Sequence, residues 1–431
     1  MTAEETSKKI GRYRYIVLGL LFIVGALACN NATKASTLVS FWGAGLSLGT
    51  VEIGRINAAY MLGFLPMVLL GGPFADWFGS KKTLLICLGG LVISGLLIAT
   101  AKDYTQMYIY NVIAGVFYGL LTPAAAKLIS QWFPAKEVGG ATSIFFSGLI
   151  ASGVLLNPIV LMLSSRVSWQ AGYNVIALAG IPVIIAMLFI FKDIPEQSKA
   201  VKPEELEYIT GARLPAGGKA NWKELQKVIT KPSVLIILIA VAVGAASTFL
   251  VSWVWYGTMG ILGINVDTVA AVTPILLGLG AAYGFFHGKV ITGVFKGNLR
   301  LVMSFGGILG VVALALAALV PMNWIVWAFL ILAIGLTLNS FLIGTSNAYF
   351  SVLLGPKYIG SVMGLLTLVQ QFFGWFISQE SGKWVNGSAE GLAQLTPIYL
   401  VSAGLCLVAA ILPWLAKGVN VLKPTTPSAS E

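Results

Sequence analysis

Residues 71–82 read GGPFADWFGSKK and lie where one apolar stretch, 52–74, gives way to another, 83–101. A helix needs about 20 apolar residues to cross the roughly 30 Å hydrocarbon core of a bilayer, and each stretch is close to that length. The aspartate, the glycines and the two lysines at the junction are typical of a loop. This part of the sequence therefore predicts two membrane-spanning helices joined by a short loop.

Apolar stretches of this kind recur along the whole chain. Of its 431 residues, 57% are hydrophobic and only 10% are charged, and the mean hydropathy is +0.88. Soluble domains carry about 25% charged residues, so a large soluble core is excluded. We predict an all-α polytopic membrane protein with about twelve transmembrane helices, at residues 14–38, 52–74, 83–101, 106–130, 139–163, 171–191, 232–262, 268–288, 300–319, 323–350, 358–380 and 396–416.

One long hydrophilic stretch divides the chain into halves. We expect an N-terminal six-helix bundle at 1–192, a cytoplasmic central loop at 193–231, a C-terminal six-helix bundle at 232–417 and a C-terminal tail at 418–431. Faint repeats relate the two halves. FPAKEVGGATS is echoed by LGPKYIGSVMG, and GGPFADWFGSKK by HGKVITGVFKGNLR. Two pseudo-symmetric bundles built from a duplicated unit are a recurring transporter design.

Glycine is abundant, with 49 residues, and it often repeats on one helix face, as in GVFYG at 115–119. Small residues let helix backbones approach closely, and helix association in lipid depends on such packing. These spacings therefore predict close helix–helix contacts.

The net charge of +11 arises from lysines and arginines that gather in alternate loops. This is the positive-inside bias, so we expect a multi-pass protein of the cell membrane with both termini in the cytoplasm. No nucleic-acid partner is expected. The three cysteines lie far apart and His287 is the single histidine, so neither a disulfide framework nor a metal site is predicted, and no cofactor is expected.

The junction at 71–82 follows a pattern of glycine, three residues, aspartate, then glycine and a basic pair, carried by Gly72, Asp76, Gly79, Lys81 and Lys82. This pattern resembles the loop signature of the major facilitator superfamily, and the likeness covers essentially the whole chain. Trp77 and Ser80 stand at positions that are usually basic. The resemblance implies that fold, and it implies that the five residues form a latch for the inward-closed state. Asp76 is expected to accept hydrogen bonds from a neighbouring helix N-terminus.

A narrower likeness rests on four segments: QWFPAKEVGGATSIFFSG, SWQAGYNVIALAG, SWVWYG and KDIPEQSKAVKPEELEYI. They look like the anion:cation symporter branch, whose members carry sugar acids, other organic anions and organophosphates. This resemblance implies a small anionic substrate, with H⁺ or Na⁺ as the coupling ion. It is stronger in the first half of the chain than in the second.

The first predicted span contains ALACNNATKAS, residues 26–36, with Lys34 inside it. A lysine in mid-span costs roughly 2.5–3.5 kcal/mol on insertion scales, so it normally faces protein or water and meets a partner. No acid lies within a helical turn of Lys34 in the sequence. A negative substrate would supply the missing charge, with Asn30 and Asn31 as hydrogen-bonding amides. The alternative is that Lys34 extends its amine into the lipid headgroups.

The branch places an aspartate–arginine pair in the first helix, where this chain has Thr33 and Lys34. Asn111 stands where many relatives carry arginine, and Tyr118 stands near where some proton-coupled members carry glutamate. The acids that would carry a coupling proton are thus replaced. Facilitated diffusion or exchange is therefore a rival to symport.

Polar and aromatic residues in other predicted spans are candidates for the same cavity, although hydrogen bonding between helices is the commoner fate of such groups. The candidate substrate-binding residues are Lys34, Asn30, Asn31, Tyr118, Asn111, Trp253, Tyr256, Asn339, Asn347, Gln370 and Gln371.

We expect a secondary active or facilitative transporter that moves a small organic anion, a carboxylate or a sugar acid, by alternating access. A transporter of a neutral or zwitterionic solute, and a non-transporting membrane sensor with the same fold, remain as alternatives. An enzyme would need clustered acids, histidines or a nucleophile with its base at membrane depth, and the sequence offers no such cluster. The protein is expected to be a monomer.

Overall fold

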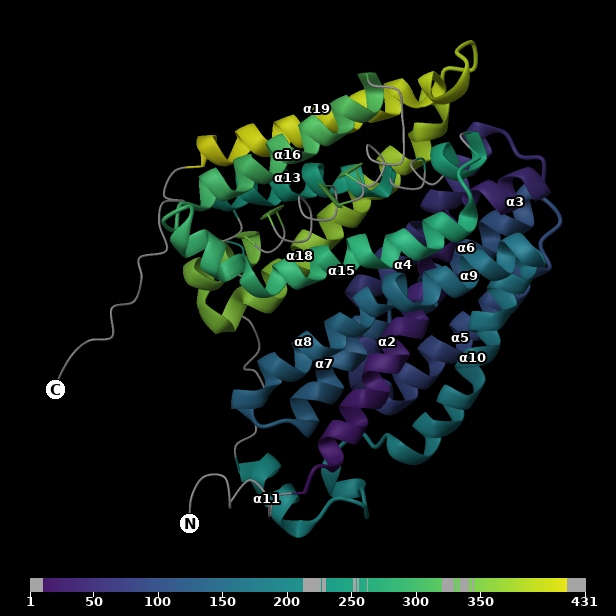
Figure 1. The fold of residues 1–431 in the computed structure, drawn as a ribbon. Coiled ribbons are helices and arrows are strands. Elements are labelled where there is room, and N and C mark those ends of the chain that lie inside the picture. Colours follow the sequence, from purple (N-terminus) through teal and green to yellow (C-terminus); the bar gives the residue numbers. More distant parts are fainter. Residues whose placement is uncertain are drawn as a thin grey trace. The chain divides into compact units, whose positions relative to one another are not determined.

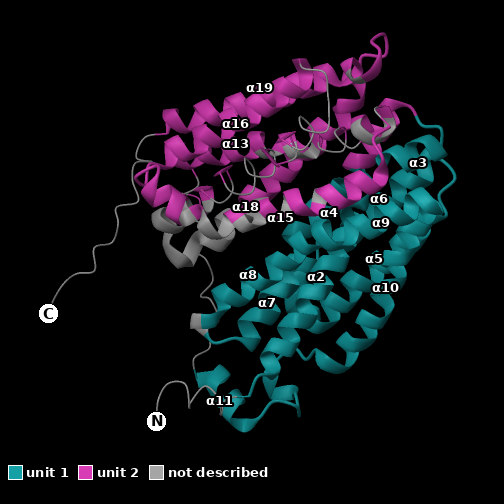
Figure 2. Cartoon of the chain, in the orientation of Figure 1, with its two compact units in different colours: residues 1–48, 59–217 teal, residues 49–58, 218–431 magenta. Residues whose placement is uncertain are grey.

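A computed structural model describes residues 11–211, 226, 230–250, 253, 256–261, 263–319, 329–330, 332–333, 341–342 and 345–416. The regular structure of this described part is entirely helical, as predicted (Figure 1). The chain divides into two compact units, residues 1–48 with 59–217 and residues 49–58 with 218–431 (Figure 2). The division after residue 217 falls inside the predicted central loop.

Unit 1 contains the helices of the first six predicted spans. Their segments long and apolar enough to cross a membrane are Tyr13–Thr37, Thr50–Phe78, Ser80–Ala99, Tyr104–Trp132, Glu137–Arg166 and Trp169–Ile190. The helices are α2 (Tyr13–Thr37), α3 (Val39–Gly45), α4 (Thr50–Phe78, whose first residues cluster with unit 2), α5 (Ser80–Ala99), α6 (Tyr104–Tyr118), α7 (Leu121–Trp132), α8 (Ala135–Ala151), η1 (Ser152–Leu156), α9 (Asn157–Arg166), α10 (Trp169–Ile190), η2 (Pro195–Gln197) and α11 (Pro203–Gly211).

The connection at 71–82 is shorter than predicted. Helix α4 continues to Phe78 and α5 starts at Ser80, so a single residue, Gly79, replaces the expected loop. Gly79 has a φ of +84°, a left-handed conformation that glycine adopts without steric cost. A Cβ on Gly79 would also lie 2.6 Å from the Asp193 Oδ1 atom. Both the backbone conformation and the crowding explain why glycine stands here.

The fifth predicted span, 139–163, is not a uniform α-helix. Helix α8 ends at Ala151 and α9 starts at Asn157, and the five residues of η1 between them form a π-helix. Pro158 gives the physical reason. It has no N–H to donate and its ring crowds the carbonyl four residues earlier, so the preceding turn widens.

Unit 2 contains α13 (Pro232–Ala246), η3 (Ser247–Leu250), η4 (Tyr256–Ile261), α15 (Val266–Gly293), α16 (Leu299–Leu319), α18 (Thr345–Ser381), η6 (Gly382–Trp384), η7 (Gly391–Leu395) and α19 (Thr396–Leu415). Two of its segments, Leu299–Leu319 and Ala393–Leu415, have the length and apolar character of membrane spans. Most of the predicted tenth span, 323–350, and the whole predicted tail, 418–431, lie outside the described residues.

The loop predicted between the tenth and eleventh spans is wrong, because residues 351–357 are helical. Helix α18 runs over 37 residues from Thr345 to Ser381. At 1.5 Å per residue it is about 55 Å long, far longer than a bilayer core of roughly 30 Å. It therefore combines the end of the tenth span, its connection and the eleventh span. Pro356 lies inside this helix and does not end it.

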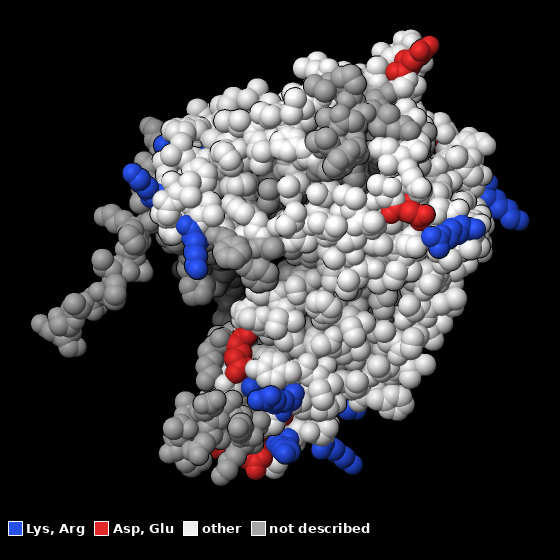
Figure 3. Space-filling view, viewed as in Figure 1, with Lys and Arg blue, Asp and Glu red and all other residues white. Residues whose placement is uncertain are grey.

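Large apolar side chains cover the outer sides of the helices. Leu69, Ile93, Phe189, Leu319 and Ile411 are each more than half exposed. On the face drawn in Figure 3 charged side chains are few, and most of the described surface is uncharged. In water such a surface would drive association, whereas lipid tails accommodate it. This pattern fits helices whose sides meet a bilayer.

Candidate functional site

Lys34 lies in the last turn of α2, so ALACNNATKAS forms part of a helix. The lysine is fully buried, with 0% of its surface exposed. Its Nζ atom donates to the Asn31 Oδ1 atom at 2.8 Å and to the Tyr173 carbonyl oxygen at 3.1 Å. It also lies 4.6 Å from the centroid of the Tyr173 ring. Two neutral dipoles and one aromatic face therefore hold the amine.

Three helices of unit 1 surround this amine: α2, α10 with Tyr173, and α5 with Gly95. A Cβ on Gly95 would come within 2.9 Å of the Asn31 Oδ1 atom and 3.6 Å of the Lys34 Nζ atom. The alternative that Lys34 extends into lipid headgroups is therefore wrong for this conformation. None of the ion pairs found among the described residues involves Lys34. Its charge has no carboxylate partner there.

Asn30 contacts a different neighbour. It is fully buried, and its Nδ2 atom donates to the Asn157 Oδ1 atom at 2.8 Å, at the start of α9. The Oδ1 atom of Asn30 has no hydrogen-bond partner among the described residues. The Thr33 hydroxyl donates to the Cys29 carbonyl oxygen of its own helix at 2.8 Å. The structure thus pairs Asn31 with Lys34 and directs Asn30 to α9.

The two candidates of the fourth predicted span lie in α6. The Asn111 Nδ2 atom donates to the Met107 carbonyl oxygen of the same helix at 2.8 Å, so the amide is satisfied locally. Tyr118 is the last residue of α6, and its ring centroid lies 5.5 Å from that of Phe64. Neither residue is among the hydrogen-bond or ring partners of Lys34.

In unit 2 the structure brings two aromatic candidates together. Trp253 is buried, and its Nε1 atom donates to the Ser381 hydroxyl at 2.8 Å. Its ring meets that of Tyr256 edge-on, with centroids 5.6 Å apart. The hydrogen bond joins Trp253 to the end of α18.

The remaining candidates of unit 2 belong to the tenth and eleventh predicted spans. Helix α18 carries Asn347, Gln370 and Gln371. The Gln371 Oε1 atom is buried and has no hydrogen-bond partner in the described part of the chain. The side chain of Asn347 and the whole of Asn339 lie outside the described residues.

The predicted latch residues flank the break between α4 and α5: Gly72 and Asp76 lie in α4, Gly79 forms the break, and Lys81 and Lys82 lie in α5. The Asp76 Oδ1 atom accepts from the Lys127 Nζ atom of α7 at 2.8 Å. At the N-terminus of α5 the carboxylate that accepts a backbone hydrogen bond belongs to Asp193, whose Oδ1 atom accepts from the Lys81 N–H at 2.8 Å. The role expected of Asp76 is thus taken by Asp193, where the helix dipole favours a negative charge.

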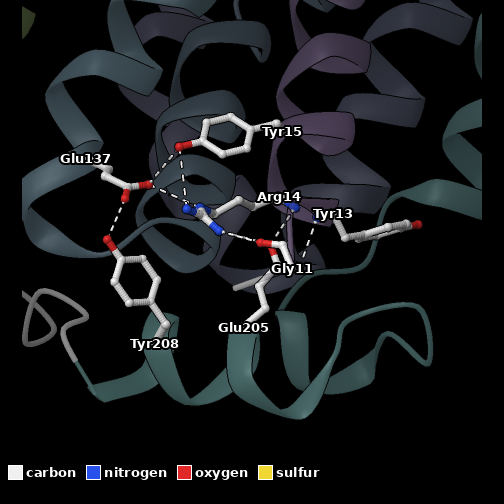
Figure 4. Close-up of polar contacts among 7 residues, drawn as sticks. All are labelled: Gly11, Tyr13, Arg14, Tyr15, Glu137, Glu205 and Tyr208. Carbon is white, nitrogen blue, oxygen red and sulfur yellow. Dashed lines mark hydrogen bonds and ion pairs between the residues drawn. The ribbon is translucent and has the colours of Figure 1, made fainter. Parts of the chain in front are cut away.

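The N-terminus of α2 is anchored by helix α11 (Figure 4). The fully buried Glu205 accepts from the backbone N–H groups of Tyr13 at 3.0 Å and Arg14 at 3.1 Å, in the first turn of α2. The Arg14 side chain bridges Glu205 at 3.2 Å and Glu137 of α8 at 3.1 Å. The Tyr208 hydroxyl donates to Glu137 at 2.6 Å. Charge-assisted hydrogen bonds thus fix the start of the helix that carries Lys34.

Glu205→Ala is expected to destabilise the protein by about 3 kcal/mol, because it removes two bonds at a helix end and one carboxylate of the buried Arg14. Thermal unfolding of the purified protein in detergent measures this. Glu207→Ala, on the exposed side of α11, is the control and is expected to stay within about 0.5 kcal/mol of the wild type. Equal unfolding temperatures for the two variants would contradict the anchoring role of Glu205.

The sequence did not reveal two partners of the candidate residues, Asn157 and Tyr173. A signal existed for Asn157, because it is an amide inside an apolar span and precedes a proline, which disturbs a helix. Tyr173 contributes a backbone carbonyl and a ring face, and neither has a recognisable sequence pattern.

Membrane-length apolar helices in two units, with a cation and amides buried among them, define a polytopic membrane protein of the transporter class. The chain belongs to the Major Facilitator Superfamily, since the model of that family matches residues 20–379. This confirms the family that GGPFADWFGSKK predicts.

Two transporters are similar to this chain in sequence, and one solved structure is similar to it in fold. The "Probable sulfoacetate transporter SauU" of Cupriavidus necator is 22% identical over 411 residues, which are 90% of this chain and 94% of that protein. The "Hexuronate transporter" of Bacillus subtilis is 23% identical over 63% of each chain. A bacterial homolog of the human lysosomal transporter Spinster, solved in an inward-facing and occupied conformation, superposes with a TM-score of 0.75 at 16% identity, covering 94% of this chain and 97% of that one. That likeness establishes the fold.

Proposed function

We propose that this protein transports a small organic anion, a carboxylate or a sugar acid, across the cell membrane by alternating access. The observation that carries the proposal is Lys34, a fully buried cation with no carboxylate partner among the described residues. Family membership supports transport. Two relatives whose names specify sulfoacetate and hexuronate support an anionic substrate.

In this proposal Lys34 supplies the positive charge that an anion meets inside unit 1. The three groups around the amine are neutral, so they do not cancel its charge. Two unit charges 8 Å apart attract each other by about 2 kcal/mol at an effective dielectric constant of about 20. The amine therefore favours an anion without direct contact. The unpaired Asn30 Oδ1 atom is proposed as an acceptor for the same substrate.

The proposal includes a monomer with both termini in the cytoplasm, and H⁺ or Na⁺ as the coupling ion where transport is coupled. Thr33 and Tyr118 stand in place of acids, and the Thr33 hydroxyl is bonded to its own backbone. Exchange or facilitated diffusion is therefore the rival to symport, and an imposed ion gradient separates the two.

Uptake into proteoliposomes tests the function. The panel contains radiolabelled gluconate, glucuronate, succinate and sulfoacetate, with glucose as the neutral member, each with and without an inward H⁺ or Na⁺ gradient. We expect saturable uptake of at least one anion and none of glucose. Acceleration by one gradient would identify the coupling ion. Uptake of glucose alone, or ligand binding without any uptake, would refute the proposal in favour of a neutral-solute carrier or a sensor.

A further inference from the structure

The hydrogen bonds of Lys34 match the neutral form of its amine. Both partners of the Nζ atom, the Asn31 Oδ1 atom at 2.8 Å and the Tyr173 carbonyl oxygen at 3.1 Å, are acceptors. The Asn31 Nδ2 atom donates to the Leu27 carbonyl oxygen at 3.1 Å, which turns the Oδ1 atom toward the amine. A neutral amine has two N–H hydrogens and an ammonium group has three. The two oxygens therefore satisfy the neutral amine completely.

The protonated amine lacks a partner for its third N–H. No further acceptor for the Nζ atom is found among the described residues, and on that side the amine meets the ring face of Tyr173. A ring face attracts a cation much less than a carboxylate does. Since Lys34 is fully buried, water does not supply the missing bond. A buried charge without an ionised partner is costly, so the empty site favours the neutral amine.

Tyr173 is the titratable neighbour that contacts the amine. The elements packed against α2 are α5, α6, α7, α8, η1, α9 and α10. No other titratable or charged side chain of these elements, or of α2 itself, is among the partners found for Lys34 in the described part of the chain. These side chains are Lys81, Lys82 and Cys87 of α5, Tyr104, Tyr108, Tyr110 and Tyr118 of α6, Lys127 of α7, Lys136 and Glu137 of α8, Arg166 of α9, and Tyr13, Arg14, Tyr15 and Cys29 of α2.

Carboxylates lie only near the ends of the helices that surround Lys34. In the six membrane-length segments from Tyr13 to Ile190 they are Glu52, Asp76 and Glu137, each within two residues of an end of its segment. Asp76 and Glu137 are also ion-paired. The interior of these segments thus contains no carboxylate that could bind and release a proton, whereas the buried amine of Lys34 can do so.

We propose that Lys34 is itself the proton carrier of this transporter. The neutral amine takes up one proton from water on the side where the anion enters, and the third N–H of the resulting ammonium group pairs with the anion. On the opposite side the anion leaves, and the ammonium group, again without a partner, returns its proton to water. The empty carrier then reorients with a neutral amine. One proton thus accompanies each anion, so a monocarboxylate moves without net charge. This inference rests on the proposed function, which supplies the anion.

Proton counting in proteoliposomes is the first test. Uptake of the radiolabelled anion that the wild type transports fastest is measured together with the internal pH, reported by a trapped fluorescent dye. We expect about one proton to enter with each anion, because the two bind in a linked equilibrium. Anion uptake without proton movement would overturn the proposal and leave the proposed function intact.

Lys34→Arg separates the charge of the residue from its ability to release a proton. Arginine stays protonated in proteins, so the loaded variant should still exchange external for internal anion. The empty variant would have to reorient with an unpaired buried charge. We therefore expect the ratio of net uptake to exchange to fall at least about tenfold below the wild-type ratio. Lys102→Arg, the same change at an exposed position, is the control. Proton-coupled net uptake by Lys34→Arg would mean that another group carries the proton, and the proposal would fail.

Thermal unfolding tests the protonation of Lys34 without a substrate. Unfolding exposes the amine to water, where a lysine binds a proton. The unfolded wild type thus binds one proton more than the folded protein, so its stability relative to Lys34→Met should rise as the pH increases from about 6.5 to about 9. If no anion is transported, the proposed function fails and this measurement decides alone. A rise supports proton binding at Lys34, and a difference that does not change with pH overturns it. Wild type and Lys102→Met, the exposed control, should differ by the same amount at every pH.

Discussion

Lys34→Met should lower the initial rate of organic-anion uptake at least about tenfold. Methionine keeps the length and apolar character of the lysine stem and removes its charge. A factor of ten corresponds to about 1.4 kcal/mol, which is less than the attraction of about 2 kcal/mol expected between unit charges 8 Å apart inside the protein. The measurement is uptake by proteoliposomes of equal protein content, with the anion that the wild type transports fastest.

The same substitution should not lower the unfolding temperature. A buried charge without an ionised partner is costly, so its removal offsets the loss of the hydrogen bonds to Asn31 and Tyr173. A gain or retention of stability together with a loss of activity is the signature of a functional group. The control is Lys102→Met, which removes an exposed lysine of unit 1. Unchanged uptake in Lys34→Met would disprove the anion-attracting role, and a loss of uptake accompanied by unfolding would assign Lys34 to the packing of unit 1.

Lys34 also shows which features of the candidate site the sequence predicts and which it does not. Its presence inside a span was readable, because a cation in an apolar stretch is costly wherever its side chain points. The direction of the side chain was not readable. Helix α2 is apolar around most of its circumference, so periodicity indicates no preferred face. The contacts with Tyr173 of α10 and the close approach of Gly95 of α5 set that direction, and these residues are far away in the sequence.

Helix positions were predicted better than helix ends. The first six predicted spans and the ninth and twelfth match membrane-length helices of the structure, because length and hydropathy determine them. The loop expected at 71–82 is the single residue Gly79, since glycine alone supplies the left-handed conformation that ends α4. In α18, Gln371 is a candidate from the sequence, whereas the absence of a hydrogen-bond partner for its buried Oε1 atom in the described part of the chain required the structure.

Gly115→Ala should lower the unfolding temperature by about 5–10 °C, the shift expected for a loss of about 2–3 kcal/mol in a domain of this size. Gly115 of α6 lies against α4, and a Cβ there would overlap the backbone carbonyl group of Tyr60. On the facing helix, a Cβ on Gly63 would overlap the carbonyl oxygen of Val112. Backbone atoms cannot rotate away as a side chain does, so the two helices would have to separate. Helix association in lipid depends on such packing.

Gly89→Ala is the matched control, because it makes the same chemical change inside α5, where an added Cβ meets no atom within 4 Å. Alanine favours a helix over glycine by about 1 kcal/mol, so this variant should unfold at or above the wild-type temperature. The two substitutions are thus expected to act in opposite directions. Thermal unfolding in detergent, followed by a tryptophan or thiol-reactive fluorescence signal, measures both. If Gly115→Ala unfolded at the same temperature as Gly89→Ala, the close contact of α4 with α6 would contribute nothing to stability, and the packing role of GVFYG would be wrong.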